Sequence, residues 1–165
     1  MLQIRVESEA AMARLGAALA RQFRPQDVIA LTGNLGSGKT VLARGMVREF
    51  CGRPDLAVAS PTFSLVQNYN NSAGEQLWHL DLYRLKAREE AWELGLDLAF
   101  SEAITLIEWP EILGDWLPAN HLKIDLQFIE DSIRLVTLTM TEAWQNRLAA
   151  VLAKLHSPET DHDKQ

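Results

Sequence analysis

The chain has 165 residues, of which 47% are hydrophobic and 23% charged, and this length and composition suit one globular domain. The formal net charge of −6, with no cluster of lysine and arginine, argues against a protein that grips nucleic acid by itself, because such affinity comes largely from clustered basic side chains. No apolar run approaches the ~20 residues that a membrane span requires, the N-terminus lacks a signal-peptide pattern, and Cys51 is the single cysteine, so we expect a cytoplasmic protein without membrane association.

The first part of the chain predicts a strand followed by a helix. Residues 2–6 alternate between apolar and polar side chains, and Ser8 is a suitable N-cap for a helix that carries apolar residues at helical spacing and ends before Pro25. We expect Ser8 mainly to cap this helix. A second possibility is that the helix N-terminus approaches the base or ribose of a nucleotide.

The segment Gly-Asn-Leu-Gly-Ser-Gly-Lys-Thr at residues 33–40 fits the phosphate-binding pattern G-x-x-x-x-G-K-[ST] at every fixed position. Its glycines let backbone N–H groups approach phosphate oxygens, Lys39 can bridge the β- and γ-phosphates, and the Thr40 hydroxyl can ligate Mg2+. An accidental glycine-rich turn is the alternative. The apolar strand predicted at residues 28–31 and the helix predicted at residues 39–50 supply the context that the pattern needs, which favours nucleotide binding.

A hairpin is expected next, with arms at residues 62–69 and 76–80 around the turn-forming residues 70–74. Thr62 lies in the sequence Ser-Pro-Thr, at the place where many P-loop hydrolases carry the loop that senses the γ-phosphate. Its hydroxyl could reach Mg2+ or that phosphate. A capping or turn role for Thr62 is equally consistent with the spacing.

Asp81 and Glu108 each end an apolar strand. Ligands gather at the carboxyl ends of parallel strands, so both carboxylates suit a role in binding a metal or orienting a water molecule. The alternative for Glu108 is that it caps a following helix. Trp109 either packs in the core or covers the nucleotide site, and His79 is expected to be a hydrogen-bonded structural histidine.

The rest of the chain predicts a short helix at residues 87–95 with outward glutamates, a closing hairpin with arms at residues 121–129 and 132–140, and a final helix. Residues 157–165 are almost entirely polar and are expected to be a mobile tail. The predicted fold class is α/β. We expect a single P-loop NTPase-like domain at residues 1–156, with a mixed, mostly parallel central sheet flanked by helices and an inserted β-hairpin.

Four motifs follow one another along the chain, and they are Gly-x-Leu-Gly-Ser-Gly-Lys-Thr (33–40), Ser-Pro-Thr-Phe-x-Leu-Val (60–66), His-x-Asp-Leu-Tyr-Arg-Leu (79–85) and Ile-Glu-Trp (107–109). Taken together, they closely resemble the TsaE family, the small bacterial ATPases of tRNA threonylcarbamoyladenosine biosynthesis. Their order and spacing are far more specific than the phosphate-binding loop alone. The resemblance implies a P-loop ATPase that uses ATP and Mg2+.

The resemblance also implies roles for individual residues. Lys39 would hold phosphate, and Thr40 and Glu108 would be the metal ligands for Mg2+. The catalytic residues would be Glu108, Asp81 and Thr62. In that set, Asp81 would support the metal or the attacking water, and Thr62 would belong to a switch-like loop.

The same resemblance implies that Trp109 lies against the nucleotide pocket and that Arg134, at the start of the last strand, lies beside the base. Ser8 and the phosphate-binding loop complete the set of candidates. The candidate nucleotide-binding residues are Ser8, Gly33, Asn34, Leu35, Gly36, Ser37, Gly38, Lys39, Thr40, Val41, Trp109 and Arg134.

The family's partners imply that this chain does not itself build the modified base. The TsaD subunit, with its companion TsaB, would transfer the threonylcarbamoyl group to adenosine 37 of certain tRNAs, and this chain would bind that assembly and hydrolyse ATP to reset it. The tRNA would be contacted mainly through the partners, and hydrolysis by the chain alone would be slow. Two alternatives stay open: a small P-loop kinase, which needs an arginine-bearing lid that does not stand out here, and a nucleotide-dependent binding module without significant turnover.

Overall fold

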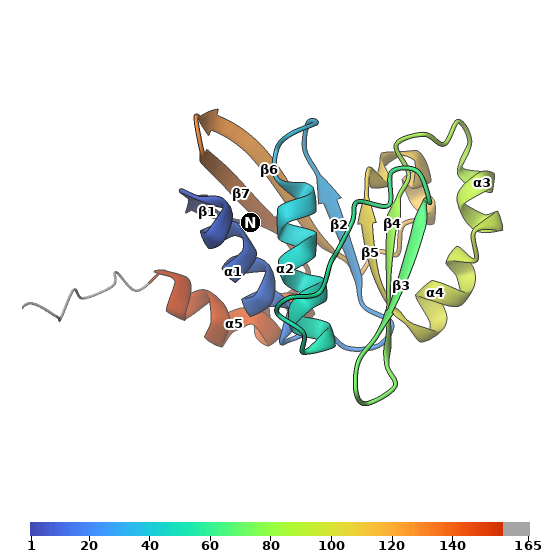
Figure 1. Ribbon diagram of the computed structural model, residues 1–165, viewed down its shortest axis with the longest axis horizontal. Coiled ribbons are helices and arrows are strands. Elements are labelled where there is room, and N and C mark those ends of the chain that lie inside the picture. The colour runs from blue at the N-terminus through green and yellow to red at the C-terminus, as the bar shows by residue number, and fades with distance from the viewer. Residues whose placement is uncertain (157–165) are drawn as a thin grey trace, which may run out of the picture.

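A seven-stranded β-sheet forms the centre of the computed structural model, which describes residues 1–156 (Figure 1). The strands, in the spatial order β1-β7-β6-β2-β5-β4-β3, are β1 (Leu2–Val6), β2 (Val28–Thr32), β3 (Val66–Asn70), β4 (Gln76–Asp81), β5 (Ile104–Glu108), β6 (Leu122–Glu130) and β7 (Ile133–Thr139). The helices are α1 (Glu9–Ala20), α2 (Lys39–Cys51), α3 (Arg88–Glu93), α4 (Leu96–Glu102), the 3-10 helix η1 (Pro110–Trp116) and α5 (Glu142–His156). The tail expected at residues 157–165 lies outside the described residues.

The four central strands, β6, β2, β5 and β4, are parallel, and both edges of the sheet are antiparallel. At one edge β7 pairs with β6 and β1, and at the other edge β3 pairs with β4. The antiparallel neighbours β3/β4 and β6/β7 are joined by short turns, whereas the parallel neighbours are joined by longer crossovers that contain helices. The predicted α/β fold, with a mixed sheet and an inserted hairpin, is confirmed, and its parallel pairs are confined to the centre.

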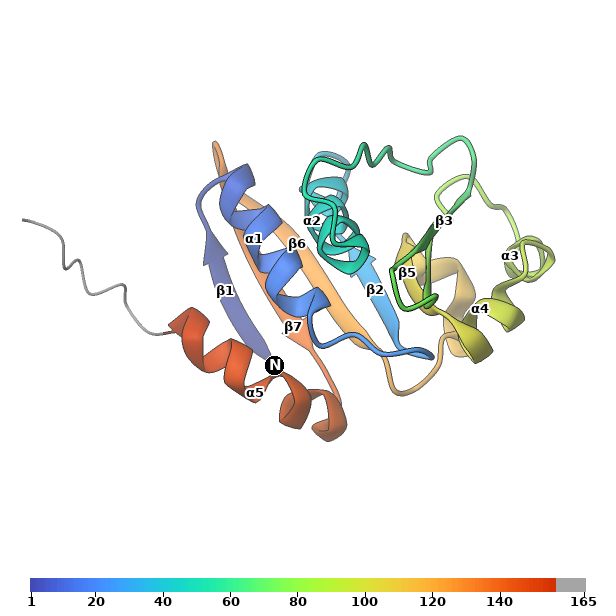
Figure 2. The same ribbon diagram turned by 60° about the horizontal axis from the view of Figure 1, so that its bottom comes forward.

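Two hydrophobic clusters stabilise the two faces of the sheet. The first lies between the sheet and α1, α2 and α5, and the second lies under α3, α4 and η1. Figures 1 and 2 show α1 and α2 side by side over one face, with α3 and α4 beside β4. Strand β2 is buried on both faces, with Ile29 and Leu31 in the first cluster and Val28 in the second. This double burial is why its sequence is continuously apolar instead of alternating.

Helices α1 and α2 approach until their backbones touch, and two glycines make this possible. A Cβ added to Gly45 would lie 2.3 Å from the Ala13 carbonyl oxygen, and one added to Gly16 would lie 2.5 Å from the Leu42 carbonyl oxygen. Only a residue without a Cβ fits at these two points. The contact fixes α1 against α2 and holds its N-terminus beside the loop at residues 33–38.

Two local predictions differ from the structure. The first arm of the hairpin begins at Val66, later than predicted, because the Leu65 amide donates a 2.7 Å hydrogen bond to the Pro61 carbonyl and closes a turn. The helix predicted at residues 87–95 corresponds to α3, but a second short helix, α4, follows it and was not predicted. The break between them is Gly95, whose φ of 92° interrupts helical geometry.

The final helix is anchored by an ion pair near the amino end of β2. Arg147 donates to both carboxylate oxygens of Asp27, with distances of 2.8 Å from Nη1 and 2.6 Å from Nη2, and Nη2 also donates to the Gln22 carbonyl. Asp27 Oδ2 accepts a further 2.7 Å hydrogen bond from the Arg24 amide. Because the side chains of Arg147 and Asp27 are only 17% and 10% exposed, this pair is largely shielded from water.

The single cysteine, Cys51, packs half-buried against the first hydrophobic cluster. Burial raises the pKa of its thiol and so disfavours the reactive thiolate. Within residues 1–156, no helix combines the length and apolar character needed to pass through a bilayer.

Candidate functional site

The carboxyl ends of β2, β4 and β5 meet at one edge of the sheet, beside an open cleft of about 560 Å³. The cleft is lined by the N-terminus of α1, the loop at residues 33–38, the start of α2, the segment at residues 60–62, the two acid-ended strands and the β6–β7 turn. Ligands of open α/β sheets bind beyond the carboxyl ends of the parallel strands. The cleft therefore lies where ligands bind in open α/β sheets.

The loop between β2 and α2 takes its shape from glycines with positive φ. Gly33 has a φ of 138°, and a Cβ added there would lie 2.5 Å from the Leu126 carbonyl oxygen. Gly38, with a φ of 107°, is the N-cap of α2, which begins at Lys39. The first amides of a helix have no intrahelical acceptor, and together with the helix dipole they favour an anion at this end. The loop and α2 therefore form an anion site at the cleft.

Lys39 places a largely buried cation in the cleft. Its side chain Nζ donates hydrogen bonds to the carbonyl oxygens of Gly33 and Asn34, at 2.5 and 3.0 Å, and lies 4.3 Å from the centre of the Trp109 ring. Burial lowers the pKa of the Lys39 ammonium, and the negative charge of Glu108 opposes this shift. The ammonium is thus held by loop carbonyls, an aromatic face and a nearby carboxylate charge.

Two buried carboxylates lie directly opposite each other at the ends of β4 and β5, because Asp81 pairs with Glu108 in the register of these strands. Both oxygens of Asp81 have partners: Oδ1 accepts a 2.9 Å hydrogen bond from the Tyr83 amide, and Oδ2 accepts one of 3.1 Å from the Thr62 hydroxyl. Glu108 Oε2 forms a 2.7 Å hydrogen bond with His79 Nε2. Glu108 Oε1 has no hydrogen-bond partner among the described residues, and it is therefore the carboxylate oxygen available to a ligand.

Thr62 lies in a turn, as one of the two interpretations of its spacing predicted, and it also lines the cleft. A contact of its hydroxyl with Mg2+ or the γ-phosphate stays a prediction. Its hydroxyl donates to Asp81 Oδ2 and lies 2.7 Å from the Ser60 hydroxyl. Because the single Thr62 proton is used toward Asp81, Ser60 is the donor in the second hydrogen bond. The chain Ser60–Thr62–Asp81 ties this segment to the end of β4.

Trp109 lines the cleft and belongs to neither hydrophobic cluster, so it does not take the core position that was one of its two alternatives. That it covers a nucleotide stays a prediction. Its φ of 57° is in the left-handed region, which is unfavourable for a bulky residue. Its ring packs against Tyr83, with 4.8 Å between ring centres. Backbone strain of this kind is concentrated at functional sites, where the surrounding structure holds it in place.

Arg134 and Ser8 approach the cleft from outside the loop. Arg134, on β7, donates from Nε to the Ser37 carbonyl at 3.1 Å and from Nη2 to the Gly36 carbonyl at 3.4 Å, while its guanidinium packs over Phe128. It therefore contacts the phosphate-binding loop directly as well as lining the cleft. Ser8 caps α1, as predicted, by accepting a 3.0 Å hydrogen bond from a first-turn amide, and it also lines the cleft.

The cleft brings together most of the residues selected from the sequence. Those that line it are Ser8, Leu35, Gly36, Gly38, Lys39, Thr40, Val41, Thr62, Asp81, Glu108, Trp109 and Arg134. The remaining candidates face a neighbouring hollow between the loop and β6, and they are Gly33, Asn34 and Ser37. The cleft-lining residues that sequence reasoning missed are Glu9, Met12, Ser60, Asp131 and Ser132. Of these five residues, Ser60 alone belongs to one of the sequence motifs. The other four lie outside the motifs and reach the cleft through tertiary packing, which the sequence does not reveal.

The donor set of the cleft fits Mg2+ that is bound together with a phosphate. Within residues 1–156 no group of three His, Cys, Asp or Glu side chains is placed to hold a metal ion. The candidate ligands are oxygens, namely the Thr40 hydroxyl and Glu108 Oε1, with Asp81 beside them. Mg2+ prefers oxygen ligands and is commonly held by one or two carboxylates together with substrate phosphates and water. Thr40 and Glu108 would therefore supply part of the shell of such an ion, and phosphate oxygens would complete it.

A family model described as "Threonylcarbamoyl adenosine biosynthesis protein TsaE" matches residues 6–136, a span that includes the loop, both acid-ended strands and Arg134. The chain belongs to the TsaE family. It is 39% identical over 134 residues to the tRNA threonylcarbamoyladenosine biosynthesis protein TsaE of Rickettsia bellii, covering 81% of this chain and 92% of that protein. The protein of the same name from Bacillus subtilis is 37% identical over 134 residues, covering 81% of this chain and 80% of its own length.

The fold agrees with the same family. The crystal structure of Bacillus subtilis YdiB superposes with a TM-score of 0.70 at 25% sequence identity, and the match covers 93% of this chain and 94% of that chain. The family and the α/β architecture predicted from the four sequence motifs are both confirmed.

Proposed function

We propose that this chain binds ATP with Mg2+ in the cleft and hydrolyses it, serving the tRNA threonylcarbamoyladenosine machinery by resetting its transferase complex between turnovers. Membership of a family named for this biosynthesis supports the pathway. One observation carries the ATPase role: the phosphate-binding loop, the buried Lys39 ammonium and the unpaired oxygen of Glu108 converge on one cleft.

Phosphate binding falls to the amides at the start of α2 and to Lys39. The ammonium donates to two loop carbonyls, and triphosphate oxygens can accept the same protons with the added advantage of negative charge. A phosphate next to Lys39 favours its charged form and so opposes the effect of burial on its pKa. Arg134 supports this arrangement by holding the Gly36 and Ser37 carbonyls of the loop.

The carboxylates have separate roles in hydrolysis. When bound, Mg2+ supplies positive charge that offsets the charge of the phosphate oxygens, and Thr40 and Glu108 Oε1 would hold it. Asp81, whose oxygens are engaged by Thr62 and the Tyr83 amide, keeps the Thr62 hydroxyl at the wall where the attacking water is oriented. Water adds to the γ-phosphorus as the bond to the ADP oxygen breaks, and both water protons leave with inorganic phosphate as H2PO4−.

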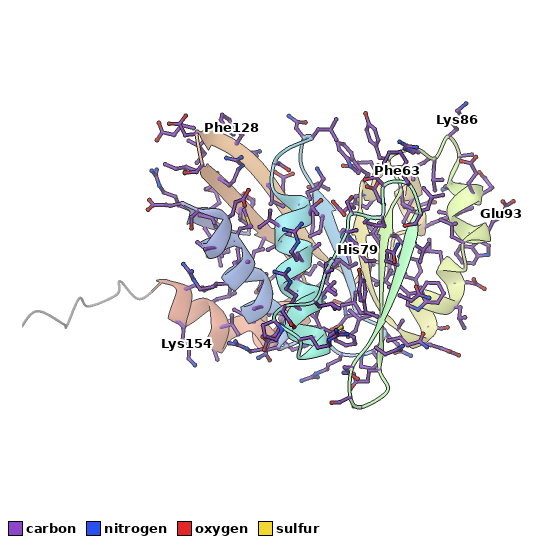
Figure 3. The ribbon with its side chains drawn as sticks, in the orientation of Figure 1. Phe63, His79, Lys86, Glu93, Phe128 and Lys154 are labelled. Carbon is purple, nitrogen blue, oxygen red and sulfur yellow. The ribbon has the colours of Figure 1, made fainter. Side chains whose placement is uncertain are left out.

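The proposed partners are TsaD and TsaB, with tRNA contacted mainly through them because this chain carries a net charge of −6. Large apolar side chains lie exposed near the cleft: Leu35 in the loop is 70% exposed and Phe63 is 81% exposed. Figure 3 shows Phe63 near the ends of β3 and β4. A partner that covers these side chains would also complete the site, consistent with slow hydrolysis by the chain alone. The proposed location is the cytoplasm.

Phosphate release in the presence of TsaD and TsaB tests the hydrolytic role of Glu108. We expect Glu108→Gln to keep ATP binding but to lower stimulated turnover by about 100-fold or more, the effect of removing one group that stabilises transition-state charge. Glu102→Gln, an exposed acid just before β5, is the matched control and should hydrolyse normally. Unchanged turnover in Glu108→Gln would remove this residue from the metal shell.

Nucleotide titration tests the loop itself. Lys39→Ala is expected to lose most of its affinity for ATP, because a cation that meets two phosphates is removed. Lys123→Ala, on the exposed face of β6, removes the same charge away from the cleft and should bind ATP normally. An ATP titration of Lys39→Ala that matches the wild-type protein would contradict the assignment of the loop.

Two other functions share the same loop and give different products. A small kinase would transfer label from ATP to a nucleoside acceptor, and it would need an arginine on a lid over that acceptor. Arg134 is the single arginine among the described cleft-lining residues, and it is hydrogen-bonded to the loop. A binding module would take up ATP without phosphate release even when TsaD and TsaB are present. Incubation with ATP, a panel of nucleosides and the partner subunits separates the three outcomes.

A further inference from the structure

His79 is fully buried on β4, and its one hydrogen bond goes to a residue of the candidate site. Its Nε2 lies 2.7 Å from Glu108 Oε2. An ionised carboxylate can only accept, so Nε2 carries a proton and donates it to Glu108. Nδ1 is buried and has no hydrogen-bond partner within residues 1–156. Figure 3 labels His79 near the centre of that view.

The surroundings of His79 would suit an apolar residue better than an imidazole. Leu77 on the same strand and Ile104 and Leu106 on β5 belong to the first hydrophobic cluster, and Leu106 is the direct pairing partner of His79. A buried ring nitrogen without a partner is unfavourable in such a site. The sequence predicted a hydrogen-bonded structural histidine, and the hydrogen bond is present, but it stabilises Glu108 specifically.

The strand register explains how His79 reaches Glu108 from behind the cleft. In the parallel pair of β4 and β5, Asp81 is opposite Glu108 and His79 is opposite Leu106. Side chains two residues apart on a strand share a face, so His79 lies one step below Asp81 and diagonal to Glu108. Glu108 and Asp81 line the cleft, whereas His79 does not. His79 therefore engages Oε2 from the core side and leaves Oε1 without a protein partner.

We propose that His79 is a positioning residue that orients the Glu108 carboxylate, so that Oε1 is presented to a Mg2+ ion bound with the nucleotide. The inference rests on the proposed function and adds to it a residue that touches neither nucleotide nor metal. Hydrogen bonds from buried partners to metal-binding carboxylates fix the ligand orientation, and their removal typically lowers metal affinity by about 10–100-fold. Without the Nε2–H donor, the carboxylate is free to turn toward the Lys39 ammonium, whose charge attracts it.

The test is a titration of MgCl2 into protein saturated with a fluorescent, slowly hydrolysed ATP analogue. His79→Leu, which removes the donor, is expected to bind Mg2+ about 10–100-fold more weakly, while analogue affinity in the presence of a chelator stays at the wild-type value. His79→Gln carries an amide N–H near the position of Nε2 and should restore Mg2+ affinity to within a few-fold of wild type. Leu77→Ala is the structural control. It loosens the same cluster without removing a donor, so it should lower the melting temperature and leave the Mg2+ titration unchanged.

Four results are informative in different ways. Wild-type Mg2+ affinity in His79→Leu would overturn the positioning role, and so would a folded His79→Gln that is as impaired as His79→Leu. Weak Mg2+ binding in His79→Leu together with recovery in His79→Gln supports it. Failure of the wild-type protein to bind the analogue at all would instead overturn the proposed function, and that failure is visible before any variant is tested.

Discussion

The contact between α1 and α2 predicts that Gly45→Ala destabilises the protein, although the same substitution stabilises an ordinary helix. Alanine in place of glycine normally stabilises a helix interior by about 1 kcal/mol. At Gly45, however, the added Cβ would lie 2.3 Å from the Ala13 carbonyl oxygen and 2.9 Å from the Ala13 Cα, which is well inside ordinary van der Waals contact. Both are backbone atoms, so no change of rotamer can relieve the overlap.

The two helices must therefore separate by about 1 Å for Gly45→Ala to fold. Separation loosens the packing of Met12 and Leu42, which are both buried between them. Overpacking typically costs about 1–3 kcal/mol, and because the overlap here is with backbone atoms we expect the upper part of that range, about 2–3 kcal/mol. The better helix propensity of alanine offsets about 1 kcal/mol of this cost. We expect the free energy of unfolding to fall by about 1–2 kcal/mol and the melting temperature by roughly 2–8 °C for a chain of this size.

Urea unfolding of the nucleotide-free protein, followed by far-ultraviolet circular dichroism, measures this change directly. The control is Ala150→Gly, at an exposed position of α5, where only helix propensity acts and a loss of about 1 kcal/mol is expected. The two opposite substitutions should thus both destabilise the protein. If Gly45→Ala were as stable as the wild type or more stable, the backbone contact would not limit the packing of α1 on α2.

Three further predictions concern other parts of the fold and the site. Arg147→Met leaves the Asp27 carboxylate buried without its ion pair and should lower the free energy of unfolding by about 3 kcal/mol, while the double variant Arg147→Met/Asp27→Leu should recover much of that loss in the same urea assay. Because burial lowers the pKa of Lys39 and a bound phosphate raises it, ATP binding in alkaline solution should take up protons and weaken as the pH rises. Calorimetry of ATP binding in two buffers of different ionisation enthalpy checks this, and binding without proton uptake would contradict it. Phe63→Ser should leave ATP affinity unchanged but reduce the stimulation by TsaD and TsaB; equal stimulation would remove Phe63 from the partner surface.

The local parts of the site could be predicted from the sequence because each has a short-range physical signature. The loop at residues 33–40 combines glycines, a lysine and a threonine at fixed spacing, and the continuous apolar run of β2 indicates a strand buried on both faces. Asp81 and Glu108 were recognised because each ends an apolar strand. These features depend on residues close together in the chain.

The long-range parts could not be predicted, because they depend on strand register and helix packing. The hydrogen bond between His79 and Glu108 requires the alignment of β4 with β5, which neither strand encodes alone. The contact of Arg134 with the loop requires β7 to lie two strands away from β2 in the sheet. Likewise, the turn that delays the start of β3 depends on a hydrogen bond between Leu65 and Pro61 that propensity does not reveal.

The hydrogen bonds of the Lys39 ammonium affect the association rate of a ligand and the conformational entropy that the loop loses on binding. Its hydrogen bonds to the Gly33 and Asn34 carbonyls join the two ends of the loop and hold the loop in one conformation. When the proposed triphosphate binds, its oxygens would replace these carbonyls as acceptors of the Lys39 protons, and the backbone would need little further ordering. Association should accordingly be limited by diffusion and by access past the exposed Leu35, and not by folding of the loop.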